Sequence, residues 1–245
     1  MEYTGAEFFN DAAVLDTYMQ HRYRKDSPNN SMEGPVIREL VGDVIGQRVL
    51  DLGCGDGRFG LELLDLGAVL YLGLEGAGRM VALADKHLEG RPGRVLLQQV
   101  EDWDYPPEAF DLVVSRLALH YVADLSALCK QIYRTLKPGG RLVFSVEHPV
   151  ITSCDRSWPA DTPRQEWTVD DYFITGERVT RWLGSTVRKY HRTVEDHFAA
   201  LQSAGLAVVA LREGAPHPEH FHDQQTFERR RRIPLFLFLV GRKRA

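Results

Sequence analysis

The sequence predicts an α/β protein with a doubly wound, Rossmann-like and mostly parallel sheet. From residue 35 onward, short apolar runs alternate with longer amphipathic segments, which is the pattern of β-α-β units. A glycine-rich turn follows the first apolar run directly, at the edge where open sheets of this class bind ligands. With 245 residues, of which 44% are hydrophobic, the chain can bury one sizeable core, and we expect a single domain over residues 1–245.

The predicted strands and helices alternate in strict order along the core, residues 36–147. Buried strands are expected at residues 48–52, 69–74, 94–99, 110–115 and 141–146. Helices are expected at residues 36–44, 59–66, 80–88 and 125–136. Because parallel strands need crossover connections, these helices should cover both faces of the sheet.

A closing helix and two strands are expected in residues 193–245. The helix opens on Thr193-Val-Glu-Asp196, which resembles a capping box, and Gly205 ends it. The two strands are expected at residues 206–211 and 234–240. We expect a loop over residues 214–232 between them, and the basic run at its end, residues 229–232, is most simply a solvated turn.

Two segments fall outside the alternation. We expect residues 1–35 to form an N-terminal helical cap, and residues 148–192 form a long insertion after the fifth strand of the core. The insertion is rich in large aromatic side chains, namely Trp158, Trp167, Tyr172, Phe173, Trp182 and Tyr190. Connections in compact α/β units usually have about 2–6 residues, so a segment of this length is typical of a substrate lid. An accessory hairpin that fills a surface groove is an equal alternative.

The composition argues against several classes of function. A net charge of −4 gives no basic field of the kind that general nucleic-acid binders carry. Three separated cysteines, Cys54, Cys129 and Cys154, suggest no disulfide framework, and no HxH or HExxH pair predicts a metal site. The N-terminus lacks a signal-peptide pattern, and no apolar run has the length of a membrane span. We therefore expect a cytoplasmic protein that binds neither membrane nor nucleic acid.

The strongest motif is the glycine turn after the first strand, with Gly53, Gly55 and Gly57 in GxGxG spacing. Glycine lets the backbone approach a ligand where a Cβ would collide. The turn also fits the dinucleotide pattern GxGxxG. However, Asp51 and Asp56 flank it, and a pyrophosphate would be poorly placed between two carboxylates. A ligand with cationic groups and no phosphate suits these acids better.

Two further motifs follow the second and third strands. Glu75 lies where a carboxylate can accept hydrogen bonds from both ribose hydroxyls, which indicates an adenosine nucleoside without choosing between cofactors. Its alternative is a solvated acid at a helix start. Residues 98–103, Gln-Gln-Val-Glu-Asp-Trp, give a polar rim that can contact an adenine edge, or form a plain turn.

With these motifs in order, residues 35–146 resemble the class I S-adenosylmethionine (SAM) dependent methyltransferases of the small-molecule, type 11-like bacterial group. One departure is Gln99, where the family usually has an acid after the third strand. The resemblance implies a seven-stranded sheet of order 3-2-1-4-5-7-6 with strand 7 antiparallel. It also implies SAM as cofactor and S-adenosylhomocysteine as product. The residues it assigns to the cofactor are Tyr18, Arg22, Asp51, Gly53, Cys54, Gly55, Gly57, Glu75, Gly76, Met80, Gln99, Glu101, Asp102 and Leu117.

The N-terminal segment is similar to the helical cap of many bacterial members, in the spacing of Tyr18, Arg22, Asn30 and Glu33. The resemblance places the Tyr18 ring near the sulfonium and pairs Arg22 with the methionyl carboxylate. The alternative is a surface helix whose tyrosine packs on the core.

Methyl transfer from SAM is an in-line displacement, so alignment contributes most and a general base is optional. The candidate catalytic residues lie after strands or in the cap and insertion: His148 first, then His120, Tyr18 and Tyr190, with Tyr121, Glu147 and His191 as further options. A structural role for each histidine stays open. The aromatic insertion favours an indole- or phenol-like metabolite as acceptor, methylated at O, N or an electron-rich carbon, and points to natural-product biosynthesis.

Three rival functions remain open. An RNA or protein methyltransferase would need a recognition module or a basic surface, and the Asn-Pro-Pro-aromatic motif of nucleobase methylation is absent after the fourth strand. A dinucleotide-dependent oxidoreductase is disfavoured by Asp51. A non-catalytic SAM-binding regulator would retain the nucleoside site alone. The sequence leaves a monomer and a homodimer equally open.

Overall fold

The computed structural model describes residues 2–3, 5–154 and 166–245. In these residues seven strands form one sheet in the order β4-β3-β2-β5-β6-β10-β9. The strands are β2 (Arg48–Leu52), β3 (Leu70–Glu75), β4 (Gly93–Leu97), β5 (Phe110–Arg116), β6 (Leu136–Glu147), β9 (Ala207–Glu213) and β10 (Phe236–Arg242). β10 runs antiparallel to both β6 and β9, and the pairs from β4 to β6 are parallel. Numbered along the chain, this is the expected order 3-2-1-4-5-7-6, which is confirmed.

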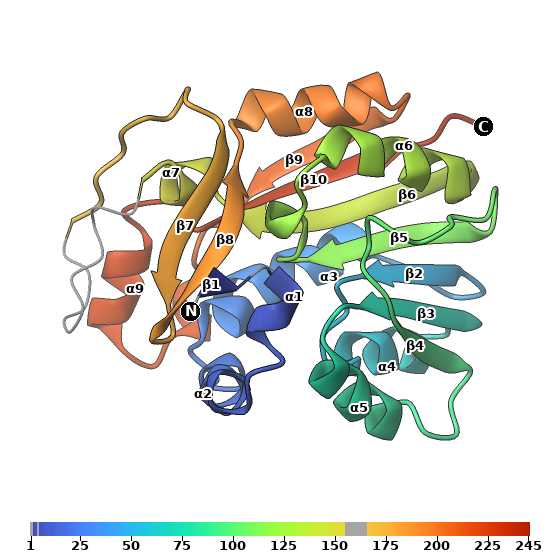
Figure 1. The fold of residues 1–245 in the computed structure, drawn as a ribbon, viewed down its shortest axis with the longest axis horizontal. Coiled ribbons are helices and arrows are strands. Elements are labelled where there is room, and N and C mark those ends of the chain that lie inside the picture. Colours follow the sequence, from blue (N-terminus) through green and yellow to red (C-terminus); the bar gives the residue numbers. More distant parts are fainter. Residues whose placement is uncertain (1, 4, 155–165) are drawn as a thin grey trace.

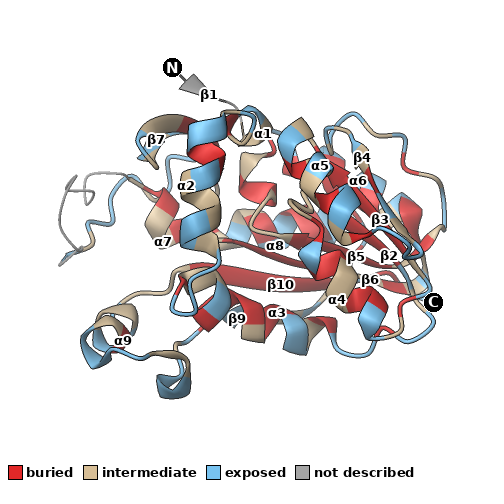
Figure 2. Ribbon diagram, turned by 90° about the horizontal axis from the view of Figure 1, so that it is seen from below, coloured by how far each residue is buried: buried red, intermediate tan, exposed pale blue. Residues whose placement is uncertain are grey.

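Helices cover both faces of the sheet, as expected (Figure 1). On one face lie α3 (Gly34–Val41), α4 (Arg58–Asp65) and α5 (Gly78–His87), and on the other lie α6 (Leu125–Thr135) and α8 (Val194–Ser203). Alternate residues of each strand point to opposite faces, so Val49 packs with the first group and Leu50 with the second. The burial view shows the strands as the most buried layer (Figure 2).

The insertion and the N-terminus join in a second, smaller sheet. The strands β7 (Gly176–Trp182) and β8 (Ser185–His191) form an antiparallel hairpin, and β1 (Glu2–Tyr3) pairs with β8 in parallel. Two cap helices follow β1, namely α1 (Gly5–Phe8) and α2 (Ala12–Arg22), and a π-helical turn, η1 (Asn29–Glu33), leads into the core. The cap and the hairpin therefore lie together over the carboxyl edge of the large sheet (Figure 1). Trp158 lies outside the described residues.

The closing elements agree with the sequence except in one segment. Thr193 and Asp196 form the expected capping box, and Gly205 has a φ of 90°. The segment expected as a loop over residues 214–232 is not all loop, because it contains α9 (Gln224–Arg230) and the short η3 (Pro218–His220). The remaining short helices are α7 (Pro149–Thr152) and η2 (Leu119–Tyr121). Within the described ranges, no helix combines the length and apolarity needed to cross a membrane.

Candidate active site

One large cavity, of about 980 Å³, lies at the carboxyl edge of the parallel strands. The cap, the glycine turn, the ends of β3, β5 and β6, the hairpin and α9 all contribute to its wall. This is the edge at which open α/β sheets bind ligands. The volume is at the upper end of the range for small-molecule sites, roughly 300–1,000 Å³, so it can hold two ligands side by side.

The three glycines of the turn serve two different needs, close packing and open space. Gly53, Gly55 and Gly57 have φ angles of 70°, 59° and 72°, in the left-handed region that favours glycine. A Cβ on Gly53 would lie 2.4 Å from the Cβ of Ala118, and one on Gly57 would lie 2.9 Å from that of Ala84. A Cβ on Gly55 would meet nothing within 4 Å, so of the three glycines only Gly55 has open space where a side chain would begin.

Asp51 is buried at the end of β2 with one carboxylate oxygen unused. Its Oδ2 accepts a hydrogen bond of 2.8 Å from the hydroxyl of Tyr71, whereas Oδ1 has no partner among the described residues. Burial raises the pKa of Asp51 to about 7, against the lowering effect of the Tyr71 hydrogen bond. A buried, unsatisfied acceptor is costly. Since Asp51 lines the cavity, a cationic or hydrogen-bond-donating ligand group would satisfy it.

Glu75 ties the glycine turn to the start of α5. Its two carboxylate oxygens accept hydrogen bonds from the backbone N–H of Gly55, at 2.9 Å, and of Ala77, at 2.8 Å. Burial raises the pKa of Glu75, and the backbone hydrogen bonds lower it. The carboxylate is thus held at the cavity wall in a fixed orientation, as a ribose acceptor requires.

The polar rim after β4 completes this half of the cavity. Gln99, Glu101 and Asp102 line the wall, and Met80 lines it from α5. The Gln99 amide packs against Gly76, where a Cβ would come within 2.7 Å of its oxygen. Burial also raises the pKa of Glu101. The rim therefore presents an amide and two carboxylates to the cavity.

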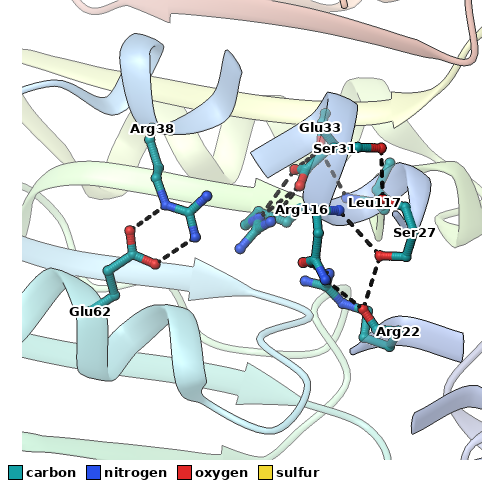
Figure 3. Close-up of polar contacts among 10 residues, drawn as sticks. Arg22, Ser27, Ser31, Glu33, Arg38, Glu62, Arg116 and Leu117 are labelled. Carbon is teal, nitrogen blue, oxygen red and sulfur yellow. Dashed lines mark hydrogen bonds and ion pairs between the residues drawn. The ribbon is translucent and has the colours of Figure 1, made fainter. Parts of the chain in front are cut away.

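A buried ion pair attaches the N-terminal segment to the sheet. Nε of Arg116, at the end of β5, lies 3.1 Å and 3.2 Å from the carboxylate oxygens of Glu33. Ser145 on β6 donates a 2.8 Å hydrogen bond to the same carboxylate, which is fully buried. The adjacent Arg22 donates to the side chain of Asn30 at 3.3 Å and lines the cavity (Figure 3).

An aromatic wall closes the cavity where the cap meets the hairpin. The ring of Tyr18 lies 4.9 Å from that of Phe9 and 5.8 Å from that of Trp182 on β7. Phe8, in the same cap, stacks on Trp182 at 5.1 Å. Burial raises the pKa of Tyr18, so its hydroxyl stays protonated at neutral pH. We call the cavity-lining residues Tyr18, Tyr121, Trp182 and Tyr190 the aromatic wall.

His120 lies beside this wall as a neutral imidazole. Burial lowers its pKa to about 4. Its Nδ1 accepts a 3.4 Å hydrogen bond from the backbone N–H of Glu147, which leaves the proton on Nε2. The carboxylate of Glu147 pairs with the buried ammonium of Lys189 at 2.7 Å. The site therefore offers a hydrogen-bond donor at His120 and an acid that already has a counter-charge.

Comparison with known proteins identifies the class to which this site belongs. A family model described as a methyltransferase domain matches residues 50–144. The crystal structure of an S-adenosylmethionine dependent methyltransferase from Mesorhizobium loti is 32% identical, covers 86% of this chain and 97% of its own, and has a TM-score of 0.79. A candidate enzyme of the same class from Listeria monocytogenes is 33% identical, with 87% and 97% coverage and a TM-score of 0.80. This chain belongs to the SAM-dependent methyltransferases.

A curated relative with a named activity agrees with this assignment. The ubiquinone/menaquinone biosynthesis C-methyltransferase UbiE of Vibrio parahaemolyticus is 27% identical over 225 residues, covering 82% of this chain and 86% of its own. The expected family and cofactor are therefore confirmed, and SAM is the cofactor of this methyltransferase. The cavity fits it, because Gly55 leaves open space and Asp51 has an oxygen free for a cationic group.

Most residues that the sequence assigned to SAM line this one cavity of the methyltransferase. Those that do are Tyr18, Arg22, Asp51, Gly53, Cys54, Gly55, Glu75, Gly76, Met80, Gln99, Glu101, Asp102 and Leu117. Gly57 does not, since it lies against α5 and permits close packing there. Leu117 has a φ of 54°, a strained conformation of the kind that concentrates at functional sites.

The candidate catalytic residues of the methyltransferase are only partly brought together. Tyr18, His120 and Tyr190 line the cavity, but His148, the first choice from sequence, does not. Its Nδ1 accepts from the backbone of Val150 at 3.2 Å and caps α7, and its Nε2 lies 2.9 Å from the carboxylate of Glu213. With both ring nitrogens engaged outside the cavity, the structure gives His148 a structural place instead.

The further option His191 is held in the same way as His148. Its ring nitrogens contact the hydroxyl of Thr152, at 2.7 Å, and the backbone of Tyr172, so it is structural too.

Sequence reasoning also missed functional candidates of the methyltransferase. Two residues not singled out for the site, Arg116 and Trp182, line the cavity. The signal for Arg116 was a charged residue at the end of a buried strand, the same signal that singled out Asp51.

Proposed function

We propose that this enzyme transfers the methyl group of SAM to a small aromatic, indole- or phenol-like metabolite, at an oxygen, a nitrogen or an electron-rich carbon. One observation carries the proposal. A single cavity runs without interruption from the glycine turn to the aromatic wall, so a nucleoside at one end and a planar ring at the other would share it. Aromatic side chains bind planar rings by stacked and edge-to-face contacts.

Each group of cofactor residues has a distinct task in this proposal. Oδ1 of Asp51 accepts from the ammonium group, and the fixed carboxylate of Glu75 accepts from the ribose hydroxyls. The rim of Gln99, Glu101 and Asp102 contacts the adenine edge, and Arg22 binds the methionyl carboxylate. SAM supplies an already activated methyl group, so the chain has to bind and orient both partners.

The chain's own groups favour alignment over base catalysis. At neutral pH His120 is uncharged with its free lone pair occupied by the Glu147 backbone, and Tyr18 stays protonated. Both are therefore donors toward the cavity. They would orient an acceptor oxygen or nitrogen, while Trp182 excludes water. Alignment alone can supply roughly 7–11 kcal/mol of rate enhancement.

The relative UbiE supports the carbon option within this proposal. Its name describes methylation at carbon in quinone biosynthesis. A carbon acceptor of this kind must be electron-rich, and hydrogen bonds to a ring hydroxyl are the contacts that His120 and Tyr18 can make. The alternative, an RNA or protein acceptor, would have to pass the cap and the hairpin, which meet over the aromatic wall.

The test begins with calorimetric titration of the protein with SAM, S-adenosylhomocysteine and NAD, repeated on Asp51→Ala and Glu75→Ala. Both adenosyl ligands should bind the native protein and bind both variants at least tenfold more weakly, since each loses a charged hydrogen-bond acceptor. Asp65→Ala is the matched control, because Asp65 is exposed on α4 and pairs only with Arg91 in the described residues.

The second stage measures S-adenosylhomocysteine formation with a panel of phenols, indoles and aliphatic amines, together with RNA and a protein extract. Turnover with members of the aromatic set would support the proposal. Turnover confined to RNA, protein or the aliphatic amines would overturn the assignment of the acceptor while leaving the cofactor site intact.

A further inference from the structure

The cavity has a basic end that the cofactor does not need. Arg229 and Arg230, the last two residues of α9, line it together with Trp167, Leu235 and Phe236. The sequence indicates a solvated turn here, but the segment is a helix whose position is fixed. Asp223 caps its start, and Phe227 is buried against Phe221 with ring centroids 5.7 Å apart.

Arg229 has a buried donor that lacks an acceptor among the described residues, and a ligand in the cavity could supply one. Its Nε lies out of solvent with no hydrogen-bond partner in the described part of the chain. The nearby acid Asp223 is fully exposed and already accepts hydrogen bonds from the backbone of Gln225 and Thr226. A guanidinium held with an unsatisfied donor at a cavity wall is costly unless an acceptor arrives from the cavity.

The acids on the neighbouring wall do not supply that acceptor. Glu33 is bound by Arg116, and Glu147 is bound by Lys189. Glu62, on α4, is bound by Arg38, and the remaining cavity-lining carboxylates lie around the glycine turn and on the rim after β4. The charged side chains of the described residues that line the α9 end are thus arginines, and the chemistry that matches a guanidinium fork is an oxyanion bound by two parallel hydrogen bonds.

The cavity spans several strands of the large sheet, since Arg116 on β5 and Phe236 on β10 both line it. Phe236, at the start of β10, pairs with Glu147 at the end of β6, and Arg116 on β5 pairs with Ser145 on β6. β10 is thus two strands from β5, or about 10 Å at 4.7–4.9 Å per strand. Figure 2 shows α9 on the opposite side of the molecule from α5, which borders the cofactor half.

We propose that the methyl acceptor carries an oxyanion, a carboxylate or a phosphate, on a short chain away from its ring, and that Arg229 binds it with Arg230 beside it. This inference rests on the proposed function and narrows its substrate class to arylalkyl carboxylic acids or arylalkyl phosphate esters. The aromatic wall would hold the ring, and the α9 arginines would fix which ring atom faces the methyl group.

The test measures binding to the protein saturated with S-adenosylhomocysteine. The ligands are 3-(4-hydroxyphenyl)propanoate, its neutral amide, and 3-(4-hydroxyphenyl)propyl phosphate, with indole-3-propanoate and its amide as a second ring. At least one anion should bind roughly ten- to a hundredfold more tightly than the neutral compound of the same ring, the range expected for charged hydrogen bonds. The order of carboxylate and phosphate identifies which oxyanion the site prefers.

Variants assign the effect to Arg229. Arg229→Gln should remove most of the preference for the anions, and Arg229→Lys should keep part of it, because the charge remains. The matched control is Arg231→Gln, since Arg231 pairs with Glu228 on the exposed side of the helix end and does not line the cavity. All three variants should bind S-adenosylhomocysteine as the native protein does.

Two results would overturn the inference. One is equal binding of anions and amides, including no binding of either; the other is a preference that survives Arg229→Gln. Failure of the native protein to bind S-adenosylhomocysteine would instead count against the proposed cofactor site, so the two ideas fail separately.

Discussion

Gly53 and Gly55 are two residues apart in the same turn, yet the structure assigns them opposite kinds of constraint. Gly53 packs against Ala118, and Gly55 faces open cavity. We expect Gly53→Ala to destabilise the fold by about 2–4 kcal/mol, through positive-φ strain and a clash with the Cβ of Ala118. Gly55→Ala should cost only about 1–2 kcal/mol, because strain alone acts.

The effect on SAM binding should have the reverse order, with the greater loss of affinity in Gly55→Ala. A methyl group on Gly55 enters the space that the cofactor needs, so Gly55→Ala should abolish SAM binding while it stays folded. Urea unfolding and calorimetry at one temperature measure both quantities. Normal SAM affinity in Gly55→Ala would show that this part of the turn does not contact the cofactor.

Asp51 should make SAM affinity depend on pH. Its pKa is raised to about 7 in the free protein, so the carboxyl is largely neutral below that pH and ionised above it. A cationic ligand favours the ionised form. Affinity should therefore rise from pH 5 to pH 7, by up to about tenfold per pH unit, while the ligand's own amino group stays charged. Asp51→Asn should bind weakly at every pH, with a flat profile.

The pH dependence of Asp51 is measured by calorimetry in two buffers of different ionisation enthalpy. At pH 6 the native protein should release protons when it binds SAM, and Asp51→Asn should not. A native profile as flat as that of the variant would place the cationic group of SAM away from this carboxylate.

At the scale of elements, the Glu33–Arg116 pair joins the cap to the sheet. Because Glu33 is fully buried, removing its charge leaves Arg116 without a partner, and breaking a buried pair in this way typically costs about 3–5 kcal/mol. We expect Glu33→Gln to lower the urea midpoint and to speed proteolysis before residue 34. Glu39→Gln, whose exposed pair with Arg212 is worth little, serves as the control.

An unchanged proteolysis rate in Glu33→Gln would mean that the cap is held by its aromatic contacts with the hairpin instead. The two anchors are separate in the structure. Phe8 and Tyr18 contact Trp182, whereas Glu33 contacts strands β5 and β6 of the large sheet.

The elements of the core were predictable, and the elements around the cavity were less so. Strands such as β2 and β5 are buried on both faces, so each appears as an apolar run bounded by turn residues. β1 has only two residues and pairs with a strand near the other end of the chain, and no local pattern encodes such a contact. The helix α9 was missed because one buried side chain, Phe227, gives no helical periodicity.

The site shows the same division between local and distant information. The turn at Gly55 and the acids Asp51 and Glu75 could be predicted from the sequence, because they lie at the carboxyl ends of two neighbouring strands, β2 and β3. His148 and His120 look equivalent in sequence, since each follows a strand. Only the structure shows that His148 turns to Glu213 on β9, a strand added after the insertion.

At the scale of the whole molecule, two buried histidines should make the fold sensitive to acid. Burial lowers the pKa of His120 to about 4 and that of His197 to about 3. Unfolded histidines have a pKa near 6.5, so the unfolded chain binds more protons between these values. Stability is therefore complete above about pH 6.5 and is lost as the pH falls toward 4. Asp51, whose pKa is raised, acts in the opposite direction over the same interval.

We expect His197→Gln to reduce the loss of unfolding free energy between pH 6.5 and 4.5 by roughly 1–2 kcal/mol. Asp51→Asn should increase that loss, because the opposing titration is gone. Urea midpoints across the interval measure both effects, with the exposed His217→Gln as control. If all three variants followed the native curve, acid unfolding would have another origin.

The pairing of β1 with β8 has a consequence for how the enzyme is made. Glu2 and Tyr3 emerge from the ribosome before the SAM-binding core, but their partners Thr186 and Val187 emerge only after that core has been synthesised. Domains fold as the chain appears, at about 5–20 residues per second. Phe8 and its neighbours must therefore wait, uncovered, until the hairpin arrives. Since α9 and Phe236 on β10 also line the cavity, a nascent chain gains a complete acceptor site only after these later elements have emerged as well.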